Sequence, residues 1–168
     1  DLGQFSGTYT VTVPAHGTRI YKAQGERRLE RTRYEAETAY ISDYQELTNN
    51  QAAKTGIYEY ADYCSSGLKA GWLGQSESND LQWRDVYSHK GGKYELTIAY
   101  ISGENRTMAV DVNGQRVQTI SVSSGSCNTV AKKTVSIQLK KGRNTIRLSN
   151  ATGWMPDIDY IDVRPVFQ

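Results

Sequence analysis

Apolar and polar residues alternate along most of the chain with the period of two that is typical of half-buried β-strands. Tyr94, Leu96, Ile98 and Tyr100 alternate in this way with glutamate, threonine and alanine. No segment shows the 3.6-residue periodicity of a convincing amphipathic helix. The pattern therefore predicts an all-β fold, an antiparallel β-sandwich. Further strands are expected over 108–112, 135–139, 146–148 and 158–163.

Turn signals lie between these strands. Asn113-Gly114 is the strongest of them, because both residues readily take the positive φ of a tight hairpin turn. Lys141-Gly142 separates the next two apolar runs. Trp83 alternates with Leu81, so we expect it in the interior of a strand.

The first part of the chain has a different character. Residues 8–13 and 18–22 flank a Pro-Ala-His-Gly break and resemble a short hairpin. Residues 25–32 are charged and almost devoid of apolar side chains, which indicates a linker or a single helical turn. We therefore expect three segments: a terminal pair of strands over 1–24, a linker over 25–32 and the sandwich domain over 33–166.

Charge and composition narrow the function. Twenty basic and 18 acidic residues give a net charge of +2, too small to favour nucleic acid or a membrane surface as partner. No run approaches the ~18 apolar residues of a membrane helix. The first residues lack the layout of a signal peptide, so we expect the chain to start after any targeting segment. Twelve Tyr and three Trp against two Phe suit sites for amphipathic ligands, and equally a sandwich with tyrosines on its surface.

The two cysteines lie in Ser/Gly-rich segments, Cys64 at 64–67 and Cys127 at 124–128. Neither belongs to a Cys-x-x-Cys motif, so zinc binding and thioredoxin-type chemistry are poorly supported. In a secreted domain the pair could form one disulfide. Two free thiols are the alternative.

Carboxylates occur at both ends of the expected sandwich. Glu35 and Glu37 are two residues apart, so on a strand their side chains would share a face. If the first and last strands are neighbours, Asp159 can join them in an oxygen-rich site that suits Ca²⁺. A solvated edge strand, with the glutamates answered by Arg31 or Arg33, is the other interpretation.

Aromatic residues in unusual settings are the candidates for ligand binding. Trp72 and Trp154 are flanked by glycine or followed closely by proline, where buried strand residues rarely occur. Sugar sites combine an aromatic platform with a few hydrogen-bonding groups, although core packing explains each tryptophan equally well. Tyr58, Tyr60 and Tyr63 form a further group in a long polar connection over 47–66, and Trp154 lies in a second connection over 149–157.

No catalytic site stands out. Glu77, Asp80 and Asp85 are available as carboxylates, but nothing in their setting indicates the raised pKa of a glycosidase acid. His16 and His89 lie far apart in loop-like contexts, and no Gly-x-Ser-x-Gly motif occurs. We therefore predict that this chain catalyses no reaction.

An ordered series of motifs resembles carbohydrate-binding modules of family 35, to which family 6 is a near relative. The series covers about 33–164: Tyr34-Glu35-Ala36-Glu37, then 64–74, 92–98, 102–106, 112–114 and 149–161. It implies a jelly-roll sandwich of the galactose-binding-domain-like type. Residues 1–17 resemble the last strands of the β-domain that ends melibiase-type α-galactosidases.

The resemblance assigns roles to individual residues. It implies a structural calcium ion held by Glu35, Glu37 and Asp159. Where many relatives have a second stacking tryptophan, this chain has Ser126-Cys127-Asn128, and a bridge from Cys127 to Cys64 would pin that loop. The implied sugar contacts are Trp72 as platform, Trp154 as second wall, Asp157 as polar contact, and Asn105 and Arg106 as hydrogen-bond donors.

The resulting expectation is a non-catalytic module that targets a covalently linked, α-galactosidase-like glycoside hydrolase to a galactose-containing or plant-type polysaccharide. The catalytic residues would lie upstream of Asp1. The protein would be secreted, periplasmic or on the cell surface, without nucleic-acid or membrane partners. The main alternative is a docking domain of the same enzyme that binds no sugar. Hydrolysis by this chain itself is the least favoured.

Overall fold

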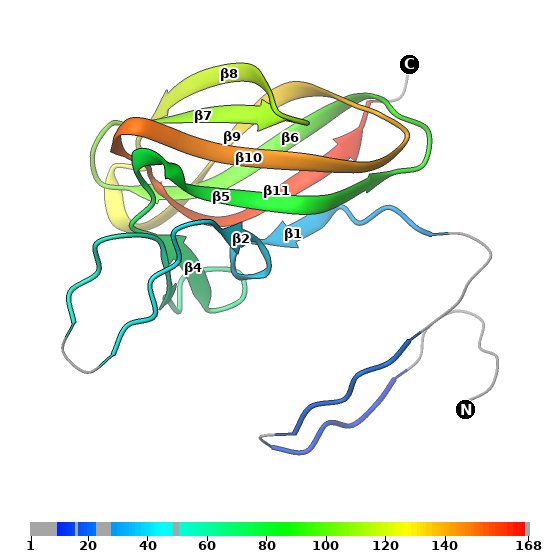
Figure 1. Cartoon of the computed structure of the whole chain (residues 1–168), viewed down its shortest axis with the longest axis horizontal. Coiled ribbons are helices and arrows are strands. Elements are labelled where there is room, and N and C mark those ends of the chain that lie inside the picture. Colours follow the sequence, from blue (N-terminus) through cyan, green and yellow to red (C-terminus); the bar gives the residue numbers. More distant parts are fainter. Residues whose placement is uncertain (1–9, 16, 23–27, 49–50, 167–168) are drawn as a thin grey trace.

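The computed structural model describes residues 10–15, 17–22, 28–48 and 51–166, and over 33–165 these form two antiparallel β-sheets packed face to face (Figure 1). The all-β sandwich predicted from the alternation is therefore confirmed. Among the described residues, no helix is long and apolar enough to cross a membrane.

Each sheet draws on strands from both ends of the chain. The first has the order β3-β4-β11-β6-β9, with β1 also paired to β11. Its strands are β1 (Arg33–Glu35), β3 (Ile57–Tyr60), β4 (Leu68–Gly71), β6 (Gly92–Ser102), β9 (Ser126–Leu139) and β11 (Asp157–Pro165). The second has the order β2-β5-β10-β7-β8, with β2 (Tyr40–Ile41), β5 (Gly74–Ser88), β7 (Arg106–Val112), β8 (Gln115–Val122) and β10 (Gly142–Trp154).

The core lies between the two sheets. Leu96 and Ile98 of the first sheet and Val110 and Leu148 of the second are completely buried in one continuous apolar cluster. Trp83 belongs to the same cluster and lies within β5, as predicted. Its indole N–H donates a hydrogen bond to the carbonyl of Glu35 at 3.1 Å. This bond fastens the end of β1 to the opposite sheet.

The predicted hairpin at Asn113-Gly114 is confirmed. The two residues connect β7 to β8 and have φ angles of 52° and 79°. Positive φ at both central positions is the requirement of a type I′ turn, which is why asparagine followed by glycine is favoured there.

The first and last strands of the sandwich are neighbours, as expected. β1 pairs with β11 in antiparallel register, with Glu35 opposite Tyr160. The expectation that Glu35 and Glu37 share one strand face is wrong. The strand stops at Glu35, and Glu37 lies in a single 3-10 turn, η1 (Ala36–Thr38). Thr38 closes this turn by donating its hydroxyl to the carbonyl of Glu35 at 2.8 Å.

The expected hairpin at the N-terminal end is not formed as strands. Within 10–15 and 17–22 the chain has one turn, closed by Gly17 N–H to the carbonyl of Pro14 at 2.9 Å, and no strand. This segment lies apart from the sandwich in Figure 1, and Ile20 is 91% exposed. A two-stranded ribbon with no sheet to cover it is marginal in water. Residues 1–9, 16 and 23–27 of the expected segments lie outside the described residues.

Residues 28–32 contain no helical turn, yet they are attached to the sandwich. The guanidinium of Arg28 forms two hydrogen bonds to the carboxylate of Asp85, at 2.9 and 2.8 Å. Tyr94 donates its hydroxyl to Glu30 at 2.9 Å. The stretch interpreted as a linker is therefore fixed to β5 and β6 over its described residues, 28–32.

Candidate functional site

A pocket of about 300 Å³ opens at one end of the sandwich, where both predicted long connections converge. Each connection contains part of a strand. The strand β3 lies within 47–66, and β10 continues to Trp154 within 149–157. We call this the loop-end pocket. Its lining residues are Glu59 of β3, Lys69 of β4, Trp72 between β4 and β5, Arg106 of β7, Trp154 of β10 and Asp157 of β11.

Trp72 is presented by an unusual backbone conformation. Its φ is 58°, in the left-handed region, which bulky residues rarely adopt. Residues in such strained conformations cluster at functional sites. Its side chain is 42% exposed. The ring meets that of Trp154 edge to face, with centroids 5.6 Å apart and an interplanar angle of 88°. The two indoles thus form an L-shaped apolar corner of the pocket.

The glycines on either side of Trp72 permit close approach. A Cβ on Gly71 would lie 2.6 Å from a carboxylate oxygen of Glu59. A Cβ on Gly74, whose φ is 100°, would lie 2.3 Å from the carbonyl of Gly153. The Gly-Trp-Leu-Gly sequence is therefore explained by crowding and by backbone conformation on both sides of the tryptophan.

Charged groups face the aromatic corner. Lys69 donates a hydrogen bond to Asp157, and its Nζ lies 3.3 Å from Glu59. Burial lowers the pKa of Lys69, but Asp157 and Glu59 outweigh this, so the pKa lies above its usual value. Burial raises the pKa of Asp157, an effect that Lys69 opposes. Trp72 donates its indole N–H to Glu59 at 3.3 Å. The pocket thus combines an apolar corner with a cluster of donors and acceptors.

Four of the five predicted sugar contacts line this pocket: Trp72, Trp154, Asp157 and Arg106. Asn105 is exposed beside it and is not among the lining residues. Arg106 is partly committed, because it donates to the carbonyl of Met155 at 3.1 Å and pairs with Glu104. The roles of these residues in binding stay predictions.

Glu59 and Lys69 were missed by the sequence analysis. Glu59 lies between Tyr58 and Tyr60 in the sequence, and Lys69 lies in the 64–74 motif. Neither has a pattern of its own that indicates a site. Only the pairing of β3 with β4, and of β4 with β11, places their charges beside Asp157.

The three tyrosines of the 47–66 connection have different environments. Tyr58 donates its hydroxyl to the carbonyl of Ala39 at 2.7 Å, and Tyr63 donates to the carbonyl of Cys127 at 3.1 Å. Tyr60 is 81% exposed and does not line the pocket.

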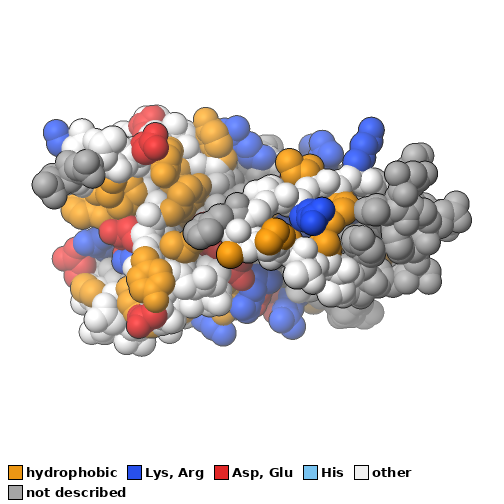
Figure 2. Space-filling model, turned by 90° about the horizontal axis from the view of Figure 1, so that it is seen from below, with side chains coloured by type: hydrophobic (Ala, Val, Ile, Leu, Met, Phe, Trp, Pro, Cys, Tyr) orange, Lys and Arg blue, Asp and Glu red, His pale blue; other side chains and the backbone are white. Residues whose placement is uncertain are grey.

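The face of the molecule seen from below carries apolar side chains scattered among charged ones (Figure 2).

Two of the three predicted calcium ligands, Glu35 and Asp159, contact the same serine. Ser65 Oγ lies 2.5 Å from a carboxylate oxygen of Glu35 and 3.1 Å from one of Asp159, to which the Ser65 N–H also donates at 3.0 Å. Burial raises the pKa of Asp159; Ser65 opposes this and the charge of Glu37 adds to it. One carboxylate oxygen of Glu37 is buried, and no hydrogen-bond partner for it occurs in the part of the chain that the structure describes.

Within the described residues, no three His, Cys, Asp or Glu side chains converge into a metal cluster. In this arrangement the Ser65 hydroxyl lies between the carboxylates of Glu35 and Asp159. The residues nevertheless fit a hard cation in two respects. All the groups present are oxygen donors, the type that Ca²⁺ prefers, and one oxygen of Glu37 is a buried acceptor with no hydrogen-bond partner among the described residues.

Of the two alternatives for Cys64 and Cys127, a bridge or two free thiols, the structure has two free thiols. Cys64 is buried in a small cluster with Ala61 and Ile101, whereas Cys127 is exposed. Burial raises the pKa of the Cys64 thiol to about 12. The hydrogen bond from Tyr63 to the carbonyl of Cys127 fastens this loop instead.

Comparison with known proteins identifies relatives of the sandwich. Residues 32–166 match the sequence profile described as carbohydrate binding module (family 35). A search of curated protein sequences gave no significant match. Solved structures with the same fold include a family 35 carbohydrate binding module from Clostridium thermocellum, with a TM-score of 0.70 and 25% identity over 79% of this chain and 98% of that one.

Two further structures are similar. The CBM35 from Paenibacillus barcinonensis has a TM-score of 0.65 and 24% identity over 80% of this chain and 99% of that one. An exo-β-1,3-galactanase from Phanerochaete chrysosporium, solved with β-1,3-galactotriose, has a TM-score of 0.66 and 24% identity. There the match covers 80% of this chain but only 29% of the galactanase.

Proposed function

This chain belongs to family 35 of the carbohydrate-binding modules, and on that premise we propose that its loop-end pocket holds a sugar unit of a polysaccharide. The family is non-catalytic, so the pocket binds without turnover. Binding by a tethered module raises the effective concentration of substrate at a linked active site. The module would therefore act by keeping an attached enzyme close to its substrate.

The aromatic corner beside the charged cluster is the observation that carries this proposal. A pyranose ring has an apolar C–H face, which suits the indole of Trp72, an exposed residue. Its hydroxyls can exchange hydrogen bonds with Asp157, Glu59 and Lys69, which line the same pocket. Rigid aromatic surface with a few fixed polar groups is the usual composition of a small-ligand site.

Affinity electrophoresis of the isolated module tests the proposal. We expect the protein to be retarded in gels that contain galactan, arabinogalactan, galactomannan or pectin, relative to gels without polysaccharide and to serum albumin. Unchanged mobility in all four would leave the alternative, a docking domain that packs on its enzyme and binds no sugar. The absence of an aromatic residue at Ser126-Cys127-Asn128 is the feature that favours this alternative.

The proposal includes a structural calcium ion held by Glu35, Glu37 and Asp159. The ion would supply the positive charge that the unpartnered oxygen of Glu37 lacks. It would also join the end of β1 to β11, which carries Asp159. Ser65 keeps the carboxylates of Glu35 and Asp159 near each other through its hydroxyl.

The linked enzyme is proposed to be a glycoside hydrolase of the α-galactosidase type, on the resemblance of residues 1–17. Galactose-containing polysaccharide is the proposed target, in a secreted, periplasmic or cell-surface protein. A galactanase of similar fold over the shared part supports the broader class of galactose-active hydrolases. It is a different enzyme, so support for the α-galactosidase assignment comes from the sequence resemblance alone.

A further inference from the structure

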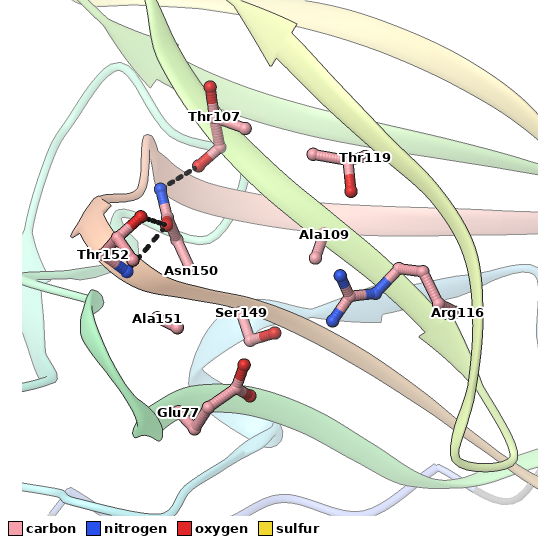
Figure 3. A pocket seen from close by; sticks show the side chains of 9 residues that line it. All are labelled: Glu77, Thr107, Ala109, Arg116, Thr119, Ser149, Asn150, Ala151 and Thr152. Carbon is pink, nitrogen blue, oxygen red and sulfur yellow. Dashed lines mark hydrogen bonds between the residues drawn. The ribbon is translucent and has the colours of Figure 1, made fainter.

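A second pocket lies on the exposed face of the β2-β5-β10-β7-β8 sheet and shares no lining residue with the loop-end pocket. We call it the sheet pocket. It has a volume of about 240 Å³. Figure 3 shows side chains of β5, β10, β7 and β8, which are consecutive neighbours in this sheet, around the same space. Its polar lining residues are Glu77 of β5, Thr107 of β7, Arg116 and Thr119 of β8, and Ser149, Asn150 and Thr152 of β10.

Ser149 is the independent sign of a ligand. The residue is 1% exposed, and its hydroxyl has no hydrogen-bond partner among the described residues. In Figure 3 this hydroxyl is turned toward the space between the side chains of Glu77 and Arg116. A buried hydroxyl without a partner costs about 1–3 kcal/mol. A molecule in the pocket that exchanges a hydrogen bond with Ser149 would remove this cost.

The walls of the sheet pocket are fixed in advance by a network of ion pairs. Arg147 donates to Glu77 at 2.9 Å and to Asp111 at 2.9 Å, and it also pairs with buried Asp80. Arg116 pairs with Asp111 from the other side. The amide of Asn150 donates to the carbonyl of Thr107 at 2.9 Å. Groups held in this way lose little further conformational entropy when a ligand binds.

The charges of the walls favour a neutral ligand. The carboxylate of Glu77 and the guanidinium of Arg116 both line the pocket, and each is already paired with an opposite charge. The whole network has three carboxylates (Glu77, Asp80 and Asp111) and two guanidiniums (Arg116 and Arg147), and this excess of negative charge disfavours an anion. A cation gains little, because Glu77, the carboxylate that lines the pocket, is already bonded to Arg147. The remaining polar groups include the hydroxyls of Thr107, Thr119 and Ser149, which both donate and accept hydrogen bonds.

The size of the pocket completes the argument. Its 240 Å³ is below the range of about 300–1,000 Å³ that accommodates drug-sized ligands, so it suits one small ring. We propose that the sheet pocket is a second carbohydrate site, which takes one neutral monosaccharide unit through its hydroxyls. The pocket and its unpartnered serine are independent of the proposed function, but the choice of a sugar among small neutral polar molecules rests on it.

Amide-resolved NMR titration of the whole chain with D-galactose, D-xylose, D-mannose and D-glucose tests this site. We expect saturable shifts at the backbone amides of Ser149, Thr152 and Thr119 with at least one sugar. The same shifts should persist in the Trp72→Ala variant, because the loop-end pocket is separate. The indole signal of buried Trp83 serves as the unchanged control. Disaccharides that bind more tightly than the free sugar would identify a polymer as the source.

Two variants make the test specific. Ser149→Ala and Thr119→Val each remove one hydroxyl and should weaken binding at these amides about twofold to tenfold. Gln138→Ala on β9 of the other sheet should leave it unchanged. No saturable shift at the sheet-pocket amides with any of the four sugars would overturn the proposal and leave water as the partner of Ser149. Shifts that disappear in Trp72→Ala would also overturn it, while the proposed function stands.

Discussion

Replacement of Trp72 by alanine is expected to weaken binding of the retained polysaccharide fragment about thirtyfold or more, the effect of losing a central aromatic anchor of about 2 kcal/mol. The variant removes the exposed ring against which the sugar would lie and one side of the contact with Trp154. Isothermal titration calorimetry measures the loss. The fold should persist, because the ring of Trp72 is not part of the core cluster.

Tyr60→Ala is the matched control for this experiment. Tyr60 is an exposed aromatic residue on the neighbouring strand β3, but it does not line the loop-end pocket. Its removal should leave the affinity within about twofold, as for a residue outside the binding centre. Equal losses in the two variants would indicate nonspecific contact with exposed aromatic surface. No loss in Trp72→Ala would place the sugar elsewhere.

Removal of calcium is expected to lower the melting temperature of the module. A ligand present at about 1,000 times its dissociation constant stabilises the folded state by about 4 kcal/mol. For a chain of this size, each kcal/mol corresponds to about 2–4 °C, so EDTA should lower the melting temperature by about 10 °C. Differential scanning calorimetry with and without added CaCl₂ measures the difference.

Asp159→Asn distinguishes a specific ion from a general salt effect. Without calcium this variant removes one of the negative charges gathered near Glu37, so its melting temperature in EDTA should equal or exceed that of the native chain. With calcium it should gain little, because one charged ligand is lost. Glu95→Gln, an exposed residue of β6, should respond to calcium as the native chain does. A native protein indifferent to EDTA would contradict the calcium proposal.

The sheets were predictable because alternation reflects burial directly. Leu96 and Ile98 alternate with exposed Glu95 and half-buried Thr97, because one face of β6 covers the core. Asn113-Gly114 is equally local, because the backbone angles of the turn select its residues. The pairing of β1 with β11 is a long-range property, and the sequence analysis put it forward only as the condition for a calcium site at the two ends of the domain.

The parts that failed are one short local turn and several contacts between residues distant in sequence. Glu37 belongs to a 3-10 turn, which the Glu-Ala-Glu spacing alone does not distinguish from a strand. Lys69 and Glu59 meet Asp157 only through pairing between strands. The predicted strands near Val11 and Ile20 have β-propensity but no described sheet to join. Cys64 packs with Ile101 rather than bonding to Cys127, which residue spacing does not reveal.

A crystal structure tests most directly whether the loop-end pocket binds sugar. The module is crystallised with an oligosaccharide of the polysaccharide that retards it most in electrophoresis. We expect a sugar ring stacked on Trp72, with its hydroxyls within hydrogen-bond distance of Asp157 or Lys69. An oligosaccharide bound at full occupancy elsewhere on the module, with no sugar against Trp72, would contradict this expectation.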